Sequence, residues 1–226
     1  DPAALERLAG VMPAIDGTYA HLDALAEQSP PVRPGPRRHW TPAPQDNPLG
    51  GWVTRTEIPG AATGPLAGRT LAVKDMIFVA GVPTTGGTDF LAGFVPEFDA
   101  PIVERALAAG ATVTGKSACE YFCCTGGSST GSSGLVRNPH RTDHCTGGSS
   151  SGSAALVAGG AVDMALGTDN GGSVRIPASI CGAVGMKATA ELVPYSGVLR
   201  MDRATDYAGP ITANVADNAR LLEVIA

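Results

Sequence analysis

Apolar segments of strand length alternate with segments of helical pattern along most of the chain after residue 60. Runs rich in apolar and β-branched residues predict strands over residues 69–79, 111–117 and 161–168. Amphipathic or small-residue runs predict helices over residues 100–110, 151–160 and 216–226. This alternation predicts an α/β fold, in which a mixed, twisted β-sheet is covered by helices on both faces.

The first 59 residues follow a different pattern. Spaced apolar residues predict two short amphipathic helices over residues 2–12 and 18–28. Residues 29–48 then hold seven prolines, which predict an extended connector because proline is excluded from helix interiors and central strands. We therefore expect residues 1–59 to form a helical arm with a proline-rich connector, and residues 60–226 to form the core.

Composition and charge narrow the possible partners. A chain of 226 residues with 43% hydrophobic content can bury the core of one sizeable domain, or most of one. The net charge of −5 argues against nucleic acid or an anionic membrane as the main partner. No apolar run approaches the roughly 20 residues of a membrane span, and the first residues lack a signal-peptide pattern. Five cysteines without the spacing of a secreted module predict free thiols and a cytoplasmic protein.

Three short motifs suggest chemistry that their surroundings do not support. GATVTGKS (110–117) fits the sequence pattern of the phosphate-binding loop, which needs a strand before it and a helix after it. Here a predicted helix precedes the motif. We therefore expect a helix–turn–strand in which Lys116 is exposed. GSSTG (127–131) and GSSSG (148–152) fit the nucleophile elbow of α/β-hydrolases, whose histidine follows the serine. All four histidines precede Ser150, so that triad cannot form in the required order.

A cluster of possible metal ligands lies between residues 119 and 145. Its members are Cys119, Cys123, Cys124, Cys145, His140 and His144. The intervening segment is mostly glycine and serine and offers no apolar core for a small zinc module, so packed free thiols are favoured and we predict no metal or cofactor. A nucleotide-binding module and a zinc-stapled interaction module stay as alternatives of other classes.

The remaining candidates are one lysine and two serine-containing turns. Lys74 lies in an apolar strand, where it is either a neutral base or the partner of Asp75 or another carboxylate in an ion pair. Ser149–Ser151 follow two glycines, as an ordinary helix cap or as catalytic serines. Ser173 follows Gly171 and Gly172, as part of a tight turn or of a cradle of backbone N–H groups around a nucleophile.

Taken together, the blocks LAVKDMIFVAGVPTT, ATVTGKS, VRNPHRTDHCTGGSSSGSAALVAGG, ALGTDNGGSVRIPASICGAVGMKAT and DYAGPITANVAD resemble the amidase signature family over about residues 60–226. Within it they are most similar to the amidases associated with nitrile hydratases. The resemblance implies a Ser–cis-Ser–Lys triad of Ser173 as nucleophile, Ser149 as proton shuttle after a cis peptide bond, and Lys74 as base. It also implies an oxyanion hole of main-chain N–H groups along Asn170, Gly171, Gly172 and Ser173, a structural pair of Asp169 and Arg175, and substrate-pocket contacts from Cys124, Thr125 and Gly126.

The implied activity is hydrolysis of a small carboxamide to a carboxylic acid and ammonia through a seryl acyl-enzyme. The alternative within the family is a glutaminase-like subunit of an amidotransferase. Two departures from the family pattern are Ala188, where proline is usual, and Ser151, where glycine is common. Family members continue for roughly as long again after the position of Ala226. We therefore expect either a homodimer or a core completed by a C-terminal half or a second chain.

Overall fold

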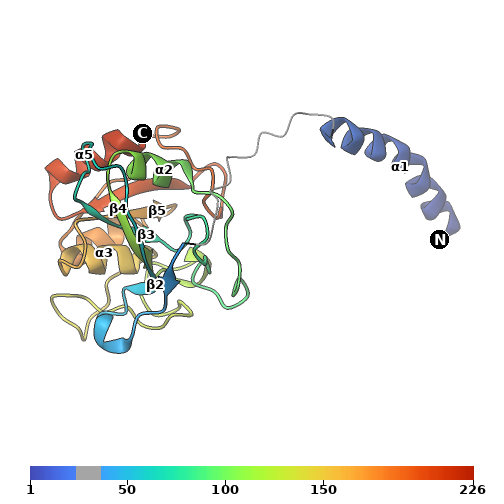
Figure 1. Cartoon of the computed structure of the whole chain (residues 1–226). Coiled ribbons are helices and arrows are strands. Elements are labelled where there is room, and N and C mark those ends of the chain that lie inside the picture. The colour runs from blue at the N-terminus through green and yellow to red at the C-terminus, as the bar shows by residue number, and fades with distance from the viewer. Residues whose placement is uncertain (24–36) are drawn as a thin grey trace. The chain divides into compact units, whose positions relative to one another are not determined.

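The computed structural model describes residues 1–23 and 37–226, which belong to two units, Asp1–Pro31 and Val32–Ala226. In the first unit, helix α1 spans Pro2–Asp23 (Figure 1). The two helices predicted over residues 2–12 and 18–28 are therefore one helix as far as Asp23, and it runs through Pro13. The rest of the second predicted helix and the first part of the predicted connector lie outside the described residues.

The second unit is built on a seven-stranded mixed sheet with the order β1-β2-β4-β3-β5-β7-β6. Strand β3 is parallel to both of its neighbours, β4 and β5, and the other pairs are antiparallel. The strands are β1 (His39–Trp40), β2 (Trp52–Ile58), β3 (Thr70–Lys74), β4 (Thr112–Ser117), β5 (Met164–Asp169), β6 (Val184–Gly185) and β7 (Tyr207–Thr212).

Helices cover both faces of this sheet, as predicted (Figure 1). Successive residues of a strand point to opposite faces, so Leu71 and Val73 of β3 join one apolar cluster and Ala72 joins another. The first cluster includes residues of α2 (Pro101–Ala108) and α5 (Val215–Ile225), and the second includes residues of α3 (Ser151–Ala158). The remaining helical elements are α4 (Arg175–Cys181) and the 3-10 turns η1 (Pro44–Asp46) and η2 (Tyr121–Cys123).

Four strands of the sheet, β1, β2, β6 and β7, were not foreseen. The sheet begins before Gly60, because β2 pairs with β4 and alternates between buried and more exposed residues. The prolines and glycines on either side of this strand hid its alternation. Strand β7 was missed because it contains Gly209 and Pro210, although it pairs with β5 along its whole length. Conversely, the strand expected over residues 69–79 ends at Lys74.

The parallel pairing of β3 with β5 brings the ends of these two strands to the same edge of the sheet. Lys74 ends β3, and Thr168 and Asp169 end β5. In open α/β sheets, ligands bind outside the carboxyl ends of the parallel strands. Within the described residues, no helix has the length and apolar character needed to cross a membrane.

Candidate active site

Lys74 is fully buried, and its two nearest partners are hydroxyl groups. Its Nζ lies 2.8 Å from Ser149 Oγ and 2.8 Å from Thr168 Oγ1. No carboxylate among the described residues lies within ion-pair distance of Lys74, so the ion pair with Asp75 considered from the sequence does not form. Nζ also donates a longer hydrogen bond of 3.5 Å to the Thr168 carbonyl. A buried lysine beside two hydroxyl groups can exchange protons with them.

Asp75 pairs with Lys116 instead. The two side chains are fully buried, with Lys116 Nζ 3.1 Å from Asp75 Oδ1 and 2.7 Å from Thr84 Oγ1. The prediction that Lys116 is exposed was therefore wrong, because β4 is an inner strand and its last residues point into the protein. Burial lowers the pKa of Lys116, and the neighbouring Asp75 carboxylate opposes that shift. The GATVTGKS segment forms strand β4 and no helix starts directly after it, so it lacks the context of a phosphate-binding loop.

The serines after Gly148 have different partners. The peptide bond between Gly148 and Ser149 is cis, as the family resemblance implied, and Ser149 is fully buried against Lys74. Ser150 Oγ contacts the backbone of Thr168, donating to its carbonyl at 3.2 Å and accepting from its N–H at 3.3 Å. Ser150 forms no side-chain cap of α3. Because Ser150 is buried and bonded to β5, the elbow interpretation with Ser150 as the nucleophile does not fit this geometry.

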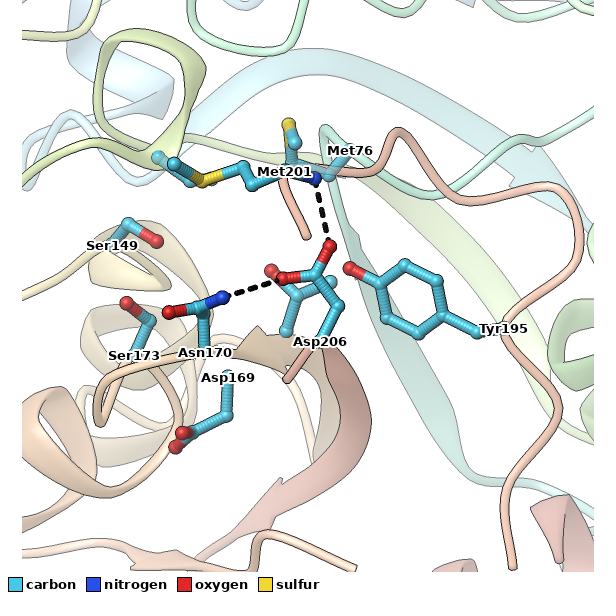
Figure 2. A pocket seen from close by; sticks show the side chains of 10 residues that line it. Met76, Ser149, Asp169, Asn170, Ser173, Tyr195, Met201 and Asp206 are labelled. Atoms are coloured by element: carbon cyan, nitrogen blue, oxygen red, sulfur yellow. Dashed lines mark hydrogen bonds between the residues drawn. The ribbon is translucent and has the colours of Figure 1, made fainter. Parts of the chain in front are cut away.

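Ser173 lines the same pocket as Ser149 (Figure 2). The figure places both serines on one side of the pocket and Tyr195 on the other. The Ser173 carbonyl accepts a hydrogen bond of 3.1 Å from the Ser150 N–H, which ties the two serine turns together. The residues that line the pocket are Met76, Cys123, Ser149, Thr168, Asp169, Asn170, Ser173, Tyr195, Met201 and Asp206.

This pocket is narrow and opens beside a larger one. Its cavity volume is about 10 Å³, which holds roughly one water-sized molecule. The neighbouring pocket has a volume of about 430 Å³, shares Tyr195 and Asp206 with the first, and contains Arg200 and Arg203. Sequence reasoning missed most of these lining residues, because they come from loops far apart along the chain.

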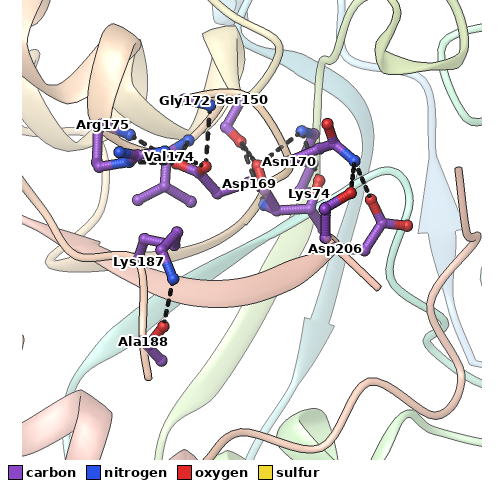
Figure 3. A network of polar contacts seen from close by, with 12 residues as sticks. Lys74, Ser150, Asp169, Asn170, Gly172, Val174, Arg175, Lys187, Ala188 and Asp206 are labelled. Carbon is purple, nitrogen blue, oxygen red and sulfur yellow. Dashed lines mark hydrogen bonds and ion pairs between the residues drawn. The ribbon is translucent and has the colours of Figure 1, made fainter. Parts of the chain in front are cut away.

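The Asp169 carboxylate organises the turn that carries Ser173 (Figure 3). It accepts hydrogen bonds from the N–H groups of Gly172 at 2.9 Å, Val174 at 3.0 Å and Arg175 at 3.3 Å. The Arg175 guanidinium adds two contacts of 2.8 and 3.1 Å. Burial alone would raise the pKa of Asp169, but the guanidinium and these N–H donors outweigh it and lower that pKa. Asp169 and Arg175 are thus the structural pair that the resemblance implied.

Among the four predicted oxyanion donors, Gly172 differs from the others. Its N–H already donates to Asp169, so this group is not free to bind a substrate oxygen. Gly172 has a φ of 130°, and a Cβ there would meet Ile176 at 2.7 Å, which explains why this position is glycine. Within the described part of the chain, the N–H groups of Asn170, Gly171 and Ser173 have no protein acceptor. A Cβ on Gly171 would meet open space.

The predicted pocket residues Cys124, Thr125 and Gly126 do not line the narrow pocket. Cys124 is exposed, and Thr125 donates its hydroxyl to Glu120 at 3.0 Å. The Gly126 carbonyl accepts the Gly148 N–H at 2.8 Å. Of these three residues, Gly126 therefore supports the peptide before Ser149, and Cys123 is the residue of this segment that lines the pocket.

The suspected metal ligands do not converge. Cys119 is buried, Cys145 is exposed, and His140 bonds the Cys181 carbonyl at 2.9 Å. His144 contacts the neighbouring Asp143. In the residues that the structure describes, no group of three or more His, Cys, Asp or Glu side chains is arranged to hold an ion.

Comparison with known proteins identifies relatives over most of the chain. A protein called an enantioselective amidase, from Rhodococcus rhodochrous, is 45% identical over 95% of this chain and 42% of its own length. A glutamyl-tRNA(Gln) amidotransferase subunit from Haloarcula marismortui is 47% identical over 78% of this chain and 41% of its own. The structure of a peptide amidase from Stenotrophomonas maltophilia matches with a TM-score of 0.69 and 41% identity, over 72% of this chain and 34% of that one.

The chain thus spans about two-fifths of the length of the relatives it matches by sequence. A family model described as Amidase matches residues 53–226, which include nearly all of β2 and every element of the site. With this match and the identities above, the chain belongs to the amidase family.

Proposed function

We propose that this chain carries the catalytic centre of an enzyme that hydrolyses small carboxamides through a seryl acyl-enzyme. The observation that carries the proposal is the buried contact of 2.8 Å between Lys74 Nζ and Ser149 Oγ, in a pocket that Ser173 also lines. The names of two relatives, an enantioselective amidase and a peptide amidase, agree with this chemistry.

In the proposed mechanism the proton moves from Ser173 to Ser149 and from Ser149 to neutral Lys74. Ser173 Oγ then attacks the amide carbonyl carbon, and the carbonyl oxygen becomes an oxyanion. When the C–N bond breaks, Ser149 returns a proton to the departing amine, which leaves as ammonia from a primary amide. Water then attacks the ester formed on Ser173 and releases the carboxylic acid.

The proposed oxyanion donors are the N–H groups of Asn170, Gly171 and Ser173. They lie on the turn that Asp169 holds in place, and such a donor is worth about 3 kcal/mol of barrier when it is fixed before the reaction. We place the acyl group of the substrate toward the larger pocket, because it shares Tyr195 and Asp206 with the narrow one.

The test of the proposed function is the Ser173→Ala variant, assayed on a series of small carboxamides with folding checked by circular dichroism. We expect amide hydrolysis and labelling by a fluorophosphonate to be lost together, because both need the nucleophile. Ser179→Ala is the matched control, since Ser179 is exposed on α4 and outside the pocket. A Ser173→Ala variant with more than a few per cent of the parent rate would refute the assignment.

The second candidate is a glutaminase-like subunit of an amidotransferase, which several relatives of similar identity support. Both functions use the same triad, so the substrate and the partner distinguish them. Hydrolysis of glutamine that rises strongly when a partner protein is added would favour the amidotransferase.

We propose that the site is completed by further protein, as a homodimer or with a C-terminal half or second chain. We also propose that the enzyme works in the reducing cytoplasm, since its five cysteines are free.

A further inference from the structure

Two cysteines lie together at the wall of the narrow pocket. Cys119 is buried in the main apolar cluster, and Cys123 is half-buried, packs against that cluster and lines the pocket. The two thiols are close enough to shift each other's pKa, upward for Cys119 and downward for Cys123. The mechanism proposed above assigns no role to either of them.

The backbone holds Cys123 in an unusual conformation. Phe122 and Cys123 both have left-handed φ values, 44° and 59°, which non-glycine residues rarely adopt. The Phe122 N–H donates to the Gly86 carbonyl and the Cys123 N–H to the Glu120 carbonyl, each at 2.9 Å. A conformation of this kind costs on the order of 1–3 kcal/mol per residue and is found at functional sites. Here it turns the Cys123 thiol toward Cys119 and the pocket.

The surroundings favour a thiolate on Cys123 and a thiol on Cys119. Burial alone would raise the pKa of Cys123, but hydrogen bonds from Cys119, Ser149 and Lys74 and the charge of Lys74 outweigh it and lower that pKa to about 6. The pKa of Cys119 is raised, by its hydrogen bond to Cys123 and by burial. Among the described residues, the other titratable groups that line this pocket are Tyr195, Asp169 and Asp206.

We propose that Cys119 and Cys123 are a redox-active pair, in which hydrogen peroxide oxidises Cys123 and Cys119 then closes a disulfide bond. Cysteines that sense peroxide are reachable thiols of low pKa with a second cysteine beside them, and Cys123 lines the pocket, is only half-buried and packs against the cluster that holds Cys119. The narrow cavity beside Cys123 admits a molecule the size of water or peroxide. The inference concerns the form of the protein in which Lys74 carries its proton, whereas the proposed mechanism begins from neutral Lys74.

The two steps balance. The Cys123 thiolate attacks one oxygen of hydrogen peroxide, the O–O bond breaks, hydroxide leaves, and Cys123 becomes a sulfenic acid. The Cys119 sulfur then attacks the Cys123 sulfur, the S–O bond breaks, and water leaves with the Cys119 proton. Two thiols are oxidised and one peroxide is reduced to two molecules of water.

The experiment treats the protein with hydrogen peroxide, blocks the remaining thiols and maps the disulfides by peptide mass spectrometry. We expect a Cys119–Cys123 disulfide that dithiothreitol reverses. In Cys119→Ala the sulfenic acid on Cys123 has no partner, so dimedone should trap it there. Cys124→Ser is the matched control, since Cys124 is the exposed neighbour outside the pocket, and it should give the same disulfide as the parent protein.

The pH dependence of the oxidation provides a second measurement that needs no variant. For a thiol with the lowered pKa of Cys123, the thiolate fraction falls about tenfold between pH about 7.5 and about 5, against roughly 300-fold for an ordinary thiol with a pKa near 8.5. We expect the rate of Cys123 oxidation to follow the smaller change. A Cys123 that stays reduced while Cys124 is oxidised, a disulfide to any other cysteine, or a rate that falls roughly 300-fold would overturn the proposal.

Discussion

Replacing Lys116 with methionine tests whether the buried lysine of β4 is structural. The side chain is fully buried, and the perturbation removes the only charge that faces Asp75 Oδ1 among the described residues. Asp75 Oδ2 keeps its hydrogen bonds from the Thr85 N–H at 2.9 Å and hydroxyl at 2.6 Å, whereas Oδ1 has no hydrogen-bond partner besides the ion pair. The variant therefore leaves half of a buried carboxylate uncompensated.

Removing one partner of a buried ion pair lowers the free energy of unfolding by about 3–5 kcal/mol. With an m-value of about 2 kcal/mol per molar urea, this corresponds to a midpoint lower by roughly 2 M. Lys116→Met/Asp75→Asn should recover part of the loss, with a coupling energy of about 2 kcal/mol, because a neutral amide tolerates burial better than an unpaired carboxylate.

The assay is urea unfolding followed by circular dichroism, together with a titration of magnesium and ATP. Lys187→Met is the matched control: Lys187 lies over the Tyr207 ring at 3.6 Å, and we expect its replacement to cost about 1 kcal/mol or less. The phosphate-loop interpretation predicts the reverse, with near-normal stability and lost ATP binding in Lys116→Met. A loss in that variant below about 1 kcal/mol would refute the structural role.

Three further predictions concern the site and its support. Ser149→Ala should slow hydrolysis of an amide by about 10²–10⁴-fold and of a matched aryl ester much less, because only the amine needs a proton to leave; equal losses in burst kinetics would remove the shuttle role. Asp169→Asn should lower the free energy of unfolding by about 1–3 kcal/mol at pH 7. Because the pKa of Asp169 is lowered in the folded protein, its carboxylate stabilises the fold above the ordinary pKa of 3.8, and this stabilisation is lost as the pH falls below that value. The difference in unfolding free energy between parent and variant should therefore shrink in acid, and an unchanged difference would contradict the stabilising role of the Asp169 carboxylate. Gly152→Ala should lower the free energy of unfolding by about 1–3 kcal/mol, since its Cβ would clash with the Gly51 carbonyl oxygen, whereas the Cβ of Gly171→Ala meets open space and this variant should melt with the parent protein; similar melting of both variants would show that the close contact relaxes without cost.

The features that the sequence predicted correctly are local. The periodic segments located β4, α2, α3 and most of β5, and contiguous family blocks brought out the cis peptide before Ser149 and the pairing of Asp169 with Arg175. The features that it missed depend on contacts between distant segments. The N–H of Gly172 is already bonded to a carboxylate, and Cys123 rather than Cys124 lines the pocket because its backbone turns left-handed.

The two buried lysines show why the sequence alone does not reveal which lysine forms an ion pair. Lys74 and Lys116 lie on neighbouring parallel strands, where Lys116 is in register with Val73, and both are fully buried. Asp75 follows Lys74 in the chain, but it begins the turn after β3, and its carboxylate meets Lys116 of the neighbouring strand instead of Lys74. A lysine beside a carboxylate is stabilised in its charged form, whereas a lysine beside two hydroxyls has partners that can give and take its proton. The position of one carboxylate, which the fold places against Lys116 although it is adjacent to Lys74 in the sequence, thus distinguishes the lysine of a buried ion pair from the lysine that we propose as the base.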